Sequence, residues 1–340
     1  MNYGLPYKGS KNRIAKKILD VLPAAPVLYD VFCGGCAITH AALLSGKYSR
    51  VVANDINGMI PHAFEKAIQG GFRNEDRWIS RDDFQRLYKT DPYVAICFSF
   101  GNNLQEYCYA RALEPYKRAL HYAIFWKDIV PWAELCPETA DALAAGLAPI
   151  EDRKQRRVQA GHFIVESLKA QLAAEMLRPD ILDKPIYRQI RKVKDTPHSL
   201  QSLESLRSLE SFERLKSLET LEHDERLQRL ESLERITDVD VSPVLTVTTG
   251  DYRALTFEQG GIIYCDPPYK NTGQYRTVGT FDFDAFYSWC EAQTLPVYIS
   301  EYSMPEDRFV PVAAFTVTRK LSAKKSNICP EKIWRPRTQL

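Results

Sequence analysis

Short apolar runs alternate with helix-like patterns near both ends of the chain. The runs are rich in β-branched and aromatic residues and too short for buried helices, so each predicts a strand. They lie at residues 27–32, 51–53, 244–248, 262–265, 297–300 and 315–318. Helical periodicity occupies residues 14–22, 38–44 and 281–289. Strands that alternate with helices predict an α/β fold with a mainly parallel sheet.

The stretch between the two sheet-forming ends has a different pattern. From about residue 59 to residue 195 the periodicity is helical and more polar. Helices are expected near residues 60–69, 80–89, 115–127 and 151–177. Because this stretch interrupts the alternation of strands and helices, we expect a largely helical insertion in the α/β sheet.

Residues 200–236 carry leucine or an apolar substitute at almost every third position, with polar residues between them. A step of three residues turns about 300° on an α-helix, so successive apolar side chains drift by about 60° and circle the helix. A 3₁₀-helix would align them but is unfavourable at this length. Composition favours a helix, and the spacing excludes a coiled-coil stripe. We expect an elongated, replaceable insertion here.

Composition and charge narrow the function by exclusion. The 340 residues are 45% hydrophobic, which suffices for a large core, and the net charge is +2. No apolar stretch approaches the ~18 residues of a membrane span and no signal peptide is evident, so we expect a cytoplasmic protein without membrane contact. Cys33 and Cys36 form a C-x-x-C pair, but the second pair that a zinc site requires is lacking, so we expect no metal.

A rigid acidic turn follows the strand predicted at 262–265. Its residues are Asp266, Pro267, Pro268 and Tyr269. The prolines end the sheet ladder and fix φ, so a carboxylate, main-chain carbonyls and an aromatic ring receive a nearly preset arrangement. A carboxylate and a carbonyl can accept both N–H bonds of an exocyclic amine while the ring stacks on a base. The turn therefore predicts a site for a flat group with an amino substituent.

A second candidate site lies where the strand at 27–32 meets a helix. Gly34 and Gly35 form the turn between them, a geometry that brings backbone amides close to a ligand. Asp55 ends the next strand, about 20 residues past the glycines, where an acidic residue can bind ribose hydroxyls. The glycines lack G-x-G-x-x-G spacing, so the pattern favours a ribosylated cofactor without phosphates.

The ordered set of motifs resembles a known family. The motifs are residues 6–11, 30–35, 54–57, 250–251 and 266–269. They occur in the order found in Dam-type (alpha-order) DNA adenine-N6 methyltransferases. Cys36 departs from the family pattern, because a second small residue such as glycine is usual at that position.

The resemblance implies a domain organisation. Residues 1–58 and 244–340 would form a Rossmann-like, S-adenosylmethionine-dependent methyltransferase sheet. Residues 59–199 would form a largely helical inserted target-recognition domain. Residues 200–243 would be the leucine-rich repeat segment and a linker.

The resemblance also implies roles for the motif residues. The methionine part of S-adenosylmethionine would be lined by Tyr7, Lys11, Phe32, Gly34 and Gly35. Asp55 would bind the ribose, and Asp251 would bind the amine of the cofactor's adenine. The catalytic group would be Asp266, Pro267, Pro268 and Tyr269.

By this resemblance the protein flips an adenine out of duplex DNA and methylates its N6. We expect a monomer that acts either in a restriction-modification system with a cognate nuclease or as an orphan or phage-type enzyme. N4 methylation of cytosine is the nearest alternative, although Asp266 at the first motif position favours adenine. Glutamine methylation of proteins is less favoured, because that group has Asn there. A non-catalytic DNA-binding scaffold is a further alternative.

Overall fold

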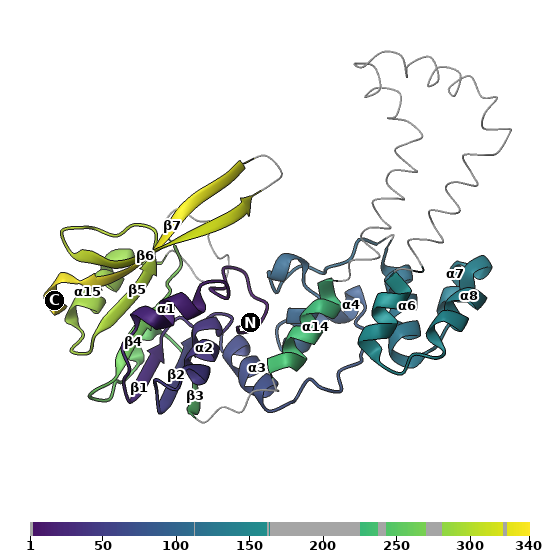
Figure 1. The fold of residues 1–340 in the computed structure, drawn as a ribbon, viewed down its shortest axis with the longest axis horizontal. Helices are drawn as coiled ribbons and strands as arrows, with labels where there is room; N and C mark the ends of the chain where they lie inside the picture. Colours follow the sequence, from purple (N-terminus) through teal and green to yellow (C-terminus); the bar gives the residue numbers. More distant parts are fainter. Residues whose placement is uncertain are drawn as a thin grey trace, which may run out of the picture. The chain divides into compact units, whose positions relative to one another are not determined.

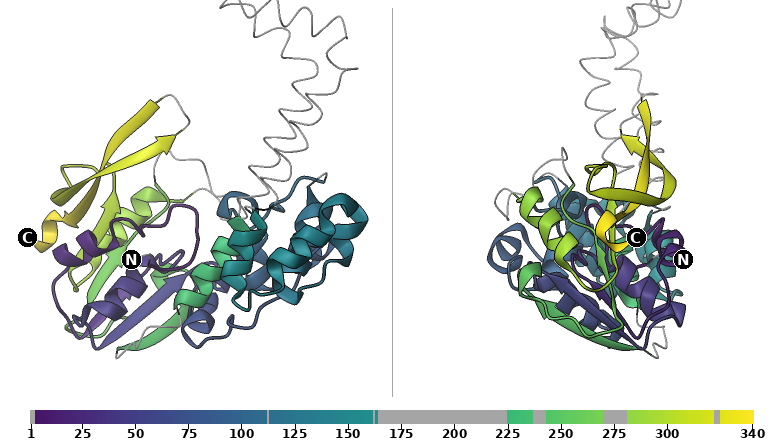
Figure 2. Two further views of the ribbon diagram at one scale, coloured as in Figure 1. Left: turned by 45° about the vertical axis from the view of Figure 1, so that its right-hand side comes forward. Right: turned by 90° about the vertical axis from the view of Figure 1, so that its left-hand side faces the viewer.

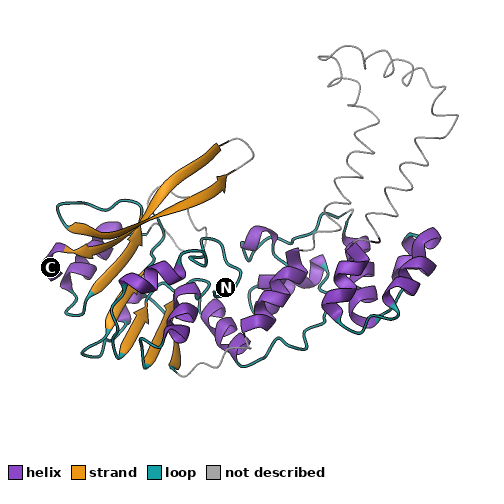
Figure 3. Cartoon of the chain, viewed as in Figure 1, coloured by secondary structure: helices purple, strands orange, loops and turns teal. Residues whose placement is uncertain are grey.

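The chain divides into two compact units. The computed structural model describes residues 3–111, 113–161, 163, 225–236, 243–269, 281–321 and 325–340. Unit 1 comprises Met1–Glu75, Arg81–Tyr107 and Arg229–Leu340, and unit 2 comprises Asp76–Ser80 and Cys108–Gln228. Unit 1 thus holds the sheet and part of the stretch 59–199, for which a recognition role stays a prediction. The described strands all lie in unit 1 (Figure 3).

Seven strands form one sheet in the order β3-β2-β1-β4-β5-β7-β6 (Figure 1). They are β1 Val27–Asp30, β2 Arg50–Asp55, β3 Val244–Thr249, β4 Ile262–Cys265, β5 Val297–Glu301, β6 Phe309–Leu321 and β7 Lys325–Pro336. The pairs from β3 to β5 are parallel, whereas β7 runs antiparallel to both β5 and β6. The predicted α/β class is therefore confirmed, and the run at 315–318 belongs to a longer strand.

The β6–β7 hairpin is the long yellow arm that extends from the sheet in Figure 2. Its strands pair from Phe309 and Pro336 at one end to Leu321 and Lys325 at the other. The register shifts between Pro311 and Ala313. Such an irregularity bends and twists a strand pair.

Helices cover both faces of the sheet. Those of unit 1 are α1 Ala15–Val21, α2 Ala37–Ser45, α3 Met59–Ile68, α4 Arg81–Leu87, α5 Pro92–Cys97 and α15 Phe283–Ala292, with the short 3₁₀ turns η1 Phe100–Asn102, η3 Tyr252–Ala254 and η4 Arg337–Gln339. Successive strand residues point to opposite faces. Asp30 therefore faces α2, where it bonds Thr39, while Tyr29 faces the core packed by α15.

Side-chain caps explain where several of these helices begin. Asp91 accepts hydrogen bonds from the backbone N–H groups of Tyr93 and Val94, with Pro92 at the first helical position of α5. Asp282 accepts from the N–H of Ala285 at the start of α15. The local sequence thus sets these boundaries before tertiary packing contributes.

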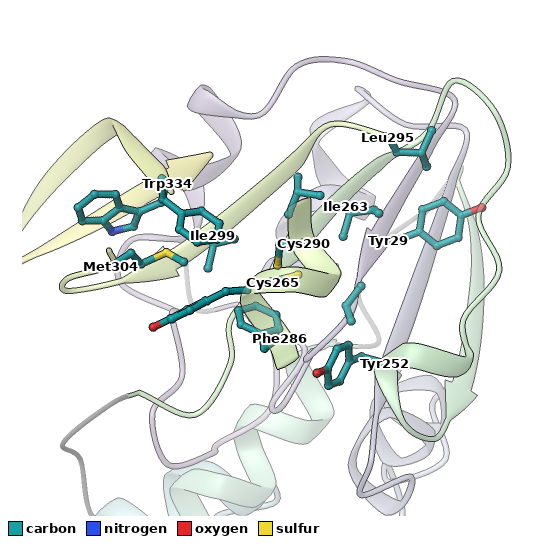
Figure 4. Packing of buried hydrophobic residues seen from close by; sticks show 14 of the residues in the cluster. Tyr29, Tyr252, Ile263, Cys265, Phe286, Cys290, Leu295, Ile299, Met304 and Trp334 are labelled. Atoms are coloured by element: carbon teal, nitrogen blue, oxygen red, sulfur yellow. The ribbon is translucent and has the colours of Figure 1, made fainter. Parts of the chain in front are cut away.

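The core of unit 1 lies between the sheet and α15 (Figure 4). Phe286 and Cys290 of α15 are fully buried against Ile263, Cys265 and other strand residues. Trp334 of β7 is 1% exposed, and its indole N–H donates to the carbonyl of Glu301 at 2.9 Å. Trp334 therefore joins the antiparallel strands to the parallel part of the sheet.

Unit 2 is built from helices in its described part. They are α6 Glu114–Trp126, α7 Val130–Leu135 and α8 Pro137–Leu147. Its core includes the buried side chains of Leu120, Ile124, Trp132, Leu143 and Leu147. Lys127 adopts the left-handed conformation at φ 57°, which ends α6. The apolar residues of these helices thus form a small helical core.

The end of the leucine-rich segment is the helix α14, Glu225–Arg235. Its buried residues are Arg226, Leu227, Arg229, Leu230 and Leu233. These positions cover an arc of about 160° on one side of the helix, because each residue turns about 100°. Residues 200–224 lie outside the described residues, so the proposed replaceable insertion stays a prediction.

In the part of the chain that the structure describes, every helix is too short or too polar to cross a bilayer. The same residues contain no group of three or more metal-ligating side chains placed to hold an ion.

Replacing Trp334 with alanine should destabilise unit 1, because it leaves a large cavity and removes the hydrogen bond to the Glu301 carbonyl. We expect a loss of about 3–5 kcal/mol in the free energy of unfolding, measured by urea denaturation. Val312→Ala is the control, since Val312 is 41% exposed and should change stability by less than about 0.5 kcal/mol. Equal losses in the two variants would contradict this role for Trp334.

Candidate active site

The site lies at the carboxyl ends of the central parallel strands. β1 pairs with both β2 and β4, with Asp30 opposite Ala53 on one side and Tyr264 on the other. Asp55 ends β2, and Asp266 follows β4 directly. Because parallel strands end at the same edge of a sheet, three carboxylates gather there.

An N-terminal segment closes over the glycine turn. The N–H of Leu5 donates to the carbonyl of Gly35 at 2.7 Å. Gly4 has φ +69°, and a Cβ on it would lie 2.4 Å from the Gly35 oxygen, so only glycine fits. A Cβ on Gly35 would lie 2.6 Å from the Cβ of Tyr7. The structure thus brings Tyr7, Gly34 and Gly35 together, and their shared role in binding a cofactor stays a prediction.

Asp55 is bound to the same turn. Its carboxylate accepts the N–H of Gly34 and the N–H of Asn57, both at 2.9 Å. Burial raises the pKa of Asp55, and the two backbone N–H bonds partly offset that rise. Cys36 takes the left-handed conformation at φ 58° just before α2, a position where glycine would be unstrained.

Asp30 opens the motif at residues 30–35, but no role was predicted for it, and it binds the first turn of α2. One carboxylate oxygen accepts the Thr39 N–H at 3.0 Å and the Thr39 hydroxyl at 2.6 Å. Burial raises the pKa of Asp30 to about 7, against the hydrogen bond of the Thr39 hydroxyl, and the charge of Asp266 adds to the rise. A polar residue at the end of a buried strand was the available signal.

Asp266 meets Lys11 across 255 positions of sequence. The Lys11 ammonium donates to one carboxylate oxygen at 2.8 Å, and the side chains are 10% and 18% exposed. Burial raises the pKa of Asp266, while the charge and hydrogen bond of Lys11 lower it. Lys11 therefore lies beside the acidic turn, next to the predicted catalytic group.

Tyr269 packs with its ring beneath that ammonium. The Lys11 nitrogen lies 4.5 Å from the ring centroid. The ring also makes an edge contact with Tyr302 at a centroid distance of 4.7 Å. Its hydroxyl donates to Glu331 of β7. Burial, followed by the charges of Asp266 and Glu331, raises the pKa of Tyr269 well above its usual range.

Glu331 is a buried carboxylate that the sequence motifs did not reveal. It is 3% exposed and lies 3.9 Å from the Lys11 ammonium. It shares a strand face with Ile333, which is fully buried. The sequence shows only an acidic residue beyond the last predicted strand. That Glu331 faces inward becomes evident only from the pairing of β7 with its neighbours.

Phe32 and Asp251 make their contacts with other residues. Phe32 packs against Tyr252 and Phe286, at centroid distances of 5.2 and 5.6 Å. Asp251 accepts the backbone N–H and the Nε of Arg253, both at 2.9 Å, and these bonds lower its pKa. The N–H of Gly250 donates to the carbonyl of Asp55 at 3.2 Å, which places the backbone before Asp251 at the end of β2.

A hollow of about 400 Å³ lies on the face of the sheet that Tyr29 occupies. It is lined by threonines of β3, by Asn54 and by Asp251. The connection from β3 to β4 contains only the short turn η3, so no long helix covers this part of the sheet. Asp266 does not line the hollow.

His40 holds the N-terminal segment in place. Its Nδ1 accepts the N–H of Gly4 at 3.0 Å, which requires an unprotonated ring nitrogen. His40 is 3% exposed, and burial lowers its pKa from 6.5 to about 4. The native protein therefore binds fewer protons here than the unfolded chain between these two pH values.

The contribution of His40 to stability should be complete above pH 6.5 and be lost as the pH falls towards 4. The shift corresponds to a contribution on the order of 3 kcal/mol. His40→Asn, whose amide oxygen can still accept a bond, should remove this part of the pH dependence. Urea unfolding of both proteins at pH 7.5 and 4.5 measures how much unfolding free energy each loses. The carboxylates contribute equally to both proteins, so their effect cancels in the comparison. An identical pH dependence in both proteins would refute it.

Comparison with known proteins bears on this geometry. Residues 7–122 match the model of a family described as D12 class N6 adenine-specific DNA methyltransferase. The match spans Tyr7, Lys11, the glycine turn and Asp55, and ends before the acidic turn at 266–269. No curated protein matches the chain.

Proposed function

We propose that the protein, whose residues 7–122 match the D12 class N6 adenine-specific DNA methyltransferase family, transfers a methyl group from S-adenosylmethionine to N6 of an adenine flipped out of duplex DNA. The observation that carries this proposal is the largely covered Asp266, which follows β4 directly before Pro267, Pro268 and Tyr269. Its carboxylate accepts a hydrogen bond from an amine-type N–H donor, Lys11.

The glycine turn supports the choice of cofactor. A side chain on Gly34 would meet the ring of Tyr7 at 3.2 Å, so the turn keeps its backbone open there. Each carboxylate oxygen of Asp55 accepts one backbone N–H and has a further lone pair for a ribose hydroxyl. At Asp251 a ligand amine would have to share the carboxylate with Arg253. When bound, S-adenosylmethionine supplies a methyl group already activated on a sulfonium.

Asp266 and the Pro267 carbonyl would then hold the target amine. The lone pair of that amine is delocalised into the base, and accepting both N–H bonds draws it out of conjugation. Tyr269 would provide the stacking surface, worth roughly 1–3 kcal/mol per base in measured cases. Positioning of the amine, without a strong general base, accounts for most of the proposed catalysis.

The charge of the site suits this reaction. The Lys11 ammonium lies near Asp266 and Glu331, and the charges of Asp266 and Asp55 act on Asp30. An amine nitrogen gains positive charge as it is methylated, and preplaced carboxylates stabilise such charge. The proton released afterwards can pass to Asp266, whose pKa burial has raised.

Duplex DNA as the partner is supported by basic residues near the site. Lys8, Arg13, Lys16 and Lys17 are exposed at the start of the chain. Exposed lysine and arginine side chains bind phosphates and give salt-dependent affinity. We propose a monomer, with or without a cognate restriction nuclease.

Asp266→Ala should lower methyl transfer by at least about 100-fold, because the amine loses its charged acceptor. Labelled S-adenosylmethionine and adenine-unmethylated genomic DNA provide the assay, with nucleoside analysis of the product. Asp284→Ala, at an exposed position of α15, is the control and should retain activity. Label found in N4-methylcytosine would show that cytosine, and not adenine, is the target base. If wild-type protein transfers no label, the scaffold alternative is favoured.

Asp55→Asn and Asp251→Asn should each weaken cofactor binding by about 10-fold, since each removes one charged hydrogen-bond acceptor. Equilibrium dialysis with labelled S-adenosylmethionine measures the affinity. Asp284→Asn again serves as the exposed control. Wild-type affinity in the Asp251 variant would show that Arg253 keeps that carboxylate from the cofactor.

A further inference from the structure

We propose that Glu331 is a positioning residue that receives Lys11 when the target amine takes Asp266. The inference rests on the proposed function, because it assumes that Asp266 holds the amine. Lys11 would then alternate between two carboxylates, Asp266 before the base binds and Glu331 once the base is bound.

The distances place Lys11 between both partners. Its ammonium lies 2.8 Å from Asp266 and 3.9 Å from Glu331. The side chain of Glu331 is only 4% exposed. A movement of about 1 Å would bring the ammonium from the longer distance to normal charge-assisted hydrogen-bond range of Glu331.

Lys11 holds the two contacts that a flipped base would need. It donates N–H to Asp266, as the base amine would. It also lies over the ring of Tyr269, where the base would stack. A base stacked on that ring would take the place of the ammonium, which lies 4.5 Å from the ring centroid. Productive binding of the base therefore requires Lys11 to move.

A second carboxylate lowers the free-energy cost of moving Lys11 away from Asp266. Leaving a buried ammonium unpaired costs several kcal/mol, and Lys11 is only 10% exposed. Glu331 offers a charge of the right sign without returning Lys11 to water. The Tyr269 hydroxyl already donates to Glu331, so the same carboxylate also fixes the ring on which the base would stack.

Glu331→Gln tests the exchange, since glutamine can still accept the Tyr269 hydroxyl but carries no charge. We expect a single-turnover methylation rate at least 10-fold lower, with cofactor and DNA affinities within twofold of wild type. Adenine-unmethylated genomic DNA is the substrate. Glu306→Gln, at an exposed position of unit 1, should retain the wild-type rate. An unchanged rate in Glu331→Gln would overturn the proposal.

A purely structural role would predict a different pattern. Glu331→Asp keeps the charge, so its methylation rate should be at least threefold higher than that of Glu331→Gln. In a Lys11→Met background, Glu331→Gln should cost less than threefold, because no ammonium is left to receive. Glu331 would be shown to act independently of Lys11 by either of two results. One is that Glu331→Gln lowers the rate as much in the Lys11→Met background as in wild type, and the other is that Glu331→Asp is no faster than Glu331→Gln.

Thermal unfolding of the DNA-free protein tests the starting state without an activity assay. Double-mutant cycles should give a larger coupling for Lys11 with Asp266 than for Lys11 with Glu331. The reverse order would overturn the proposal, because Lys11 would already rest on Glu331. Wild-type protein that forms no N6-methyladenine would instead refute the proposed function, whatever the cycles show.

Discussion

The ion pair between Lys11 and Asp266 is the interaction on which the site depends. It joins an N-terminal segment to the end of β4, and both side chains are largely removed from water. Three more acidic residues, Asp30, Asp55 and Glu331, lie around the same strand ends. Gathering carboxylates away from water is costly. Carboxylates whose pKa is raised by burial are typical of functional sites.

The N-terminal segment reaches this position through backbone contacts that tolerate few substitutions. Gly4 and Gly35 approach so closely that an added Cβ would overlap neighbouring backbone or side-chain atoms. His40 holds the N–H of Gly4 from α2. The placement of Lys11 thus depends on small residues far from the acidic turn. Changes in this segment would act on the chemistry without touching the reacting groups.

Prediction from sequence was strongest where local covalent and conformational constraints act. Two prolines after an apolar run end a strand and orient Asp266 and Tyr269, and that behaviour needs no tertiary contact. The central strands and most described helices lie within a few residues of their predicted ranges. In α14 the buried Leu227, Leu230 and Leu233 lie about 60° apart in succession around the helix, which is the drift that the three-residue spacing predicts.

The partners of these residues were decided only by the tertiary structure. Lys11 and Asp266 are 255 positions apart, and Tyr269 and Glu331 are 62 apart, so no local pattern relates them. Glu331 faces inward because of the antiparallel register of β7, which depends on pairing with β5 and β6. The sequence determined the fold class, the acidic turn and the glycine turn, because proline, glycine and apolar periodicity act over a few residues. Which charges meet there depended on how distant strands pair.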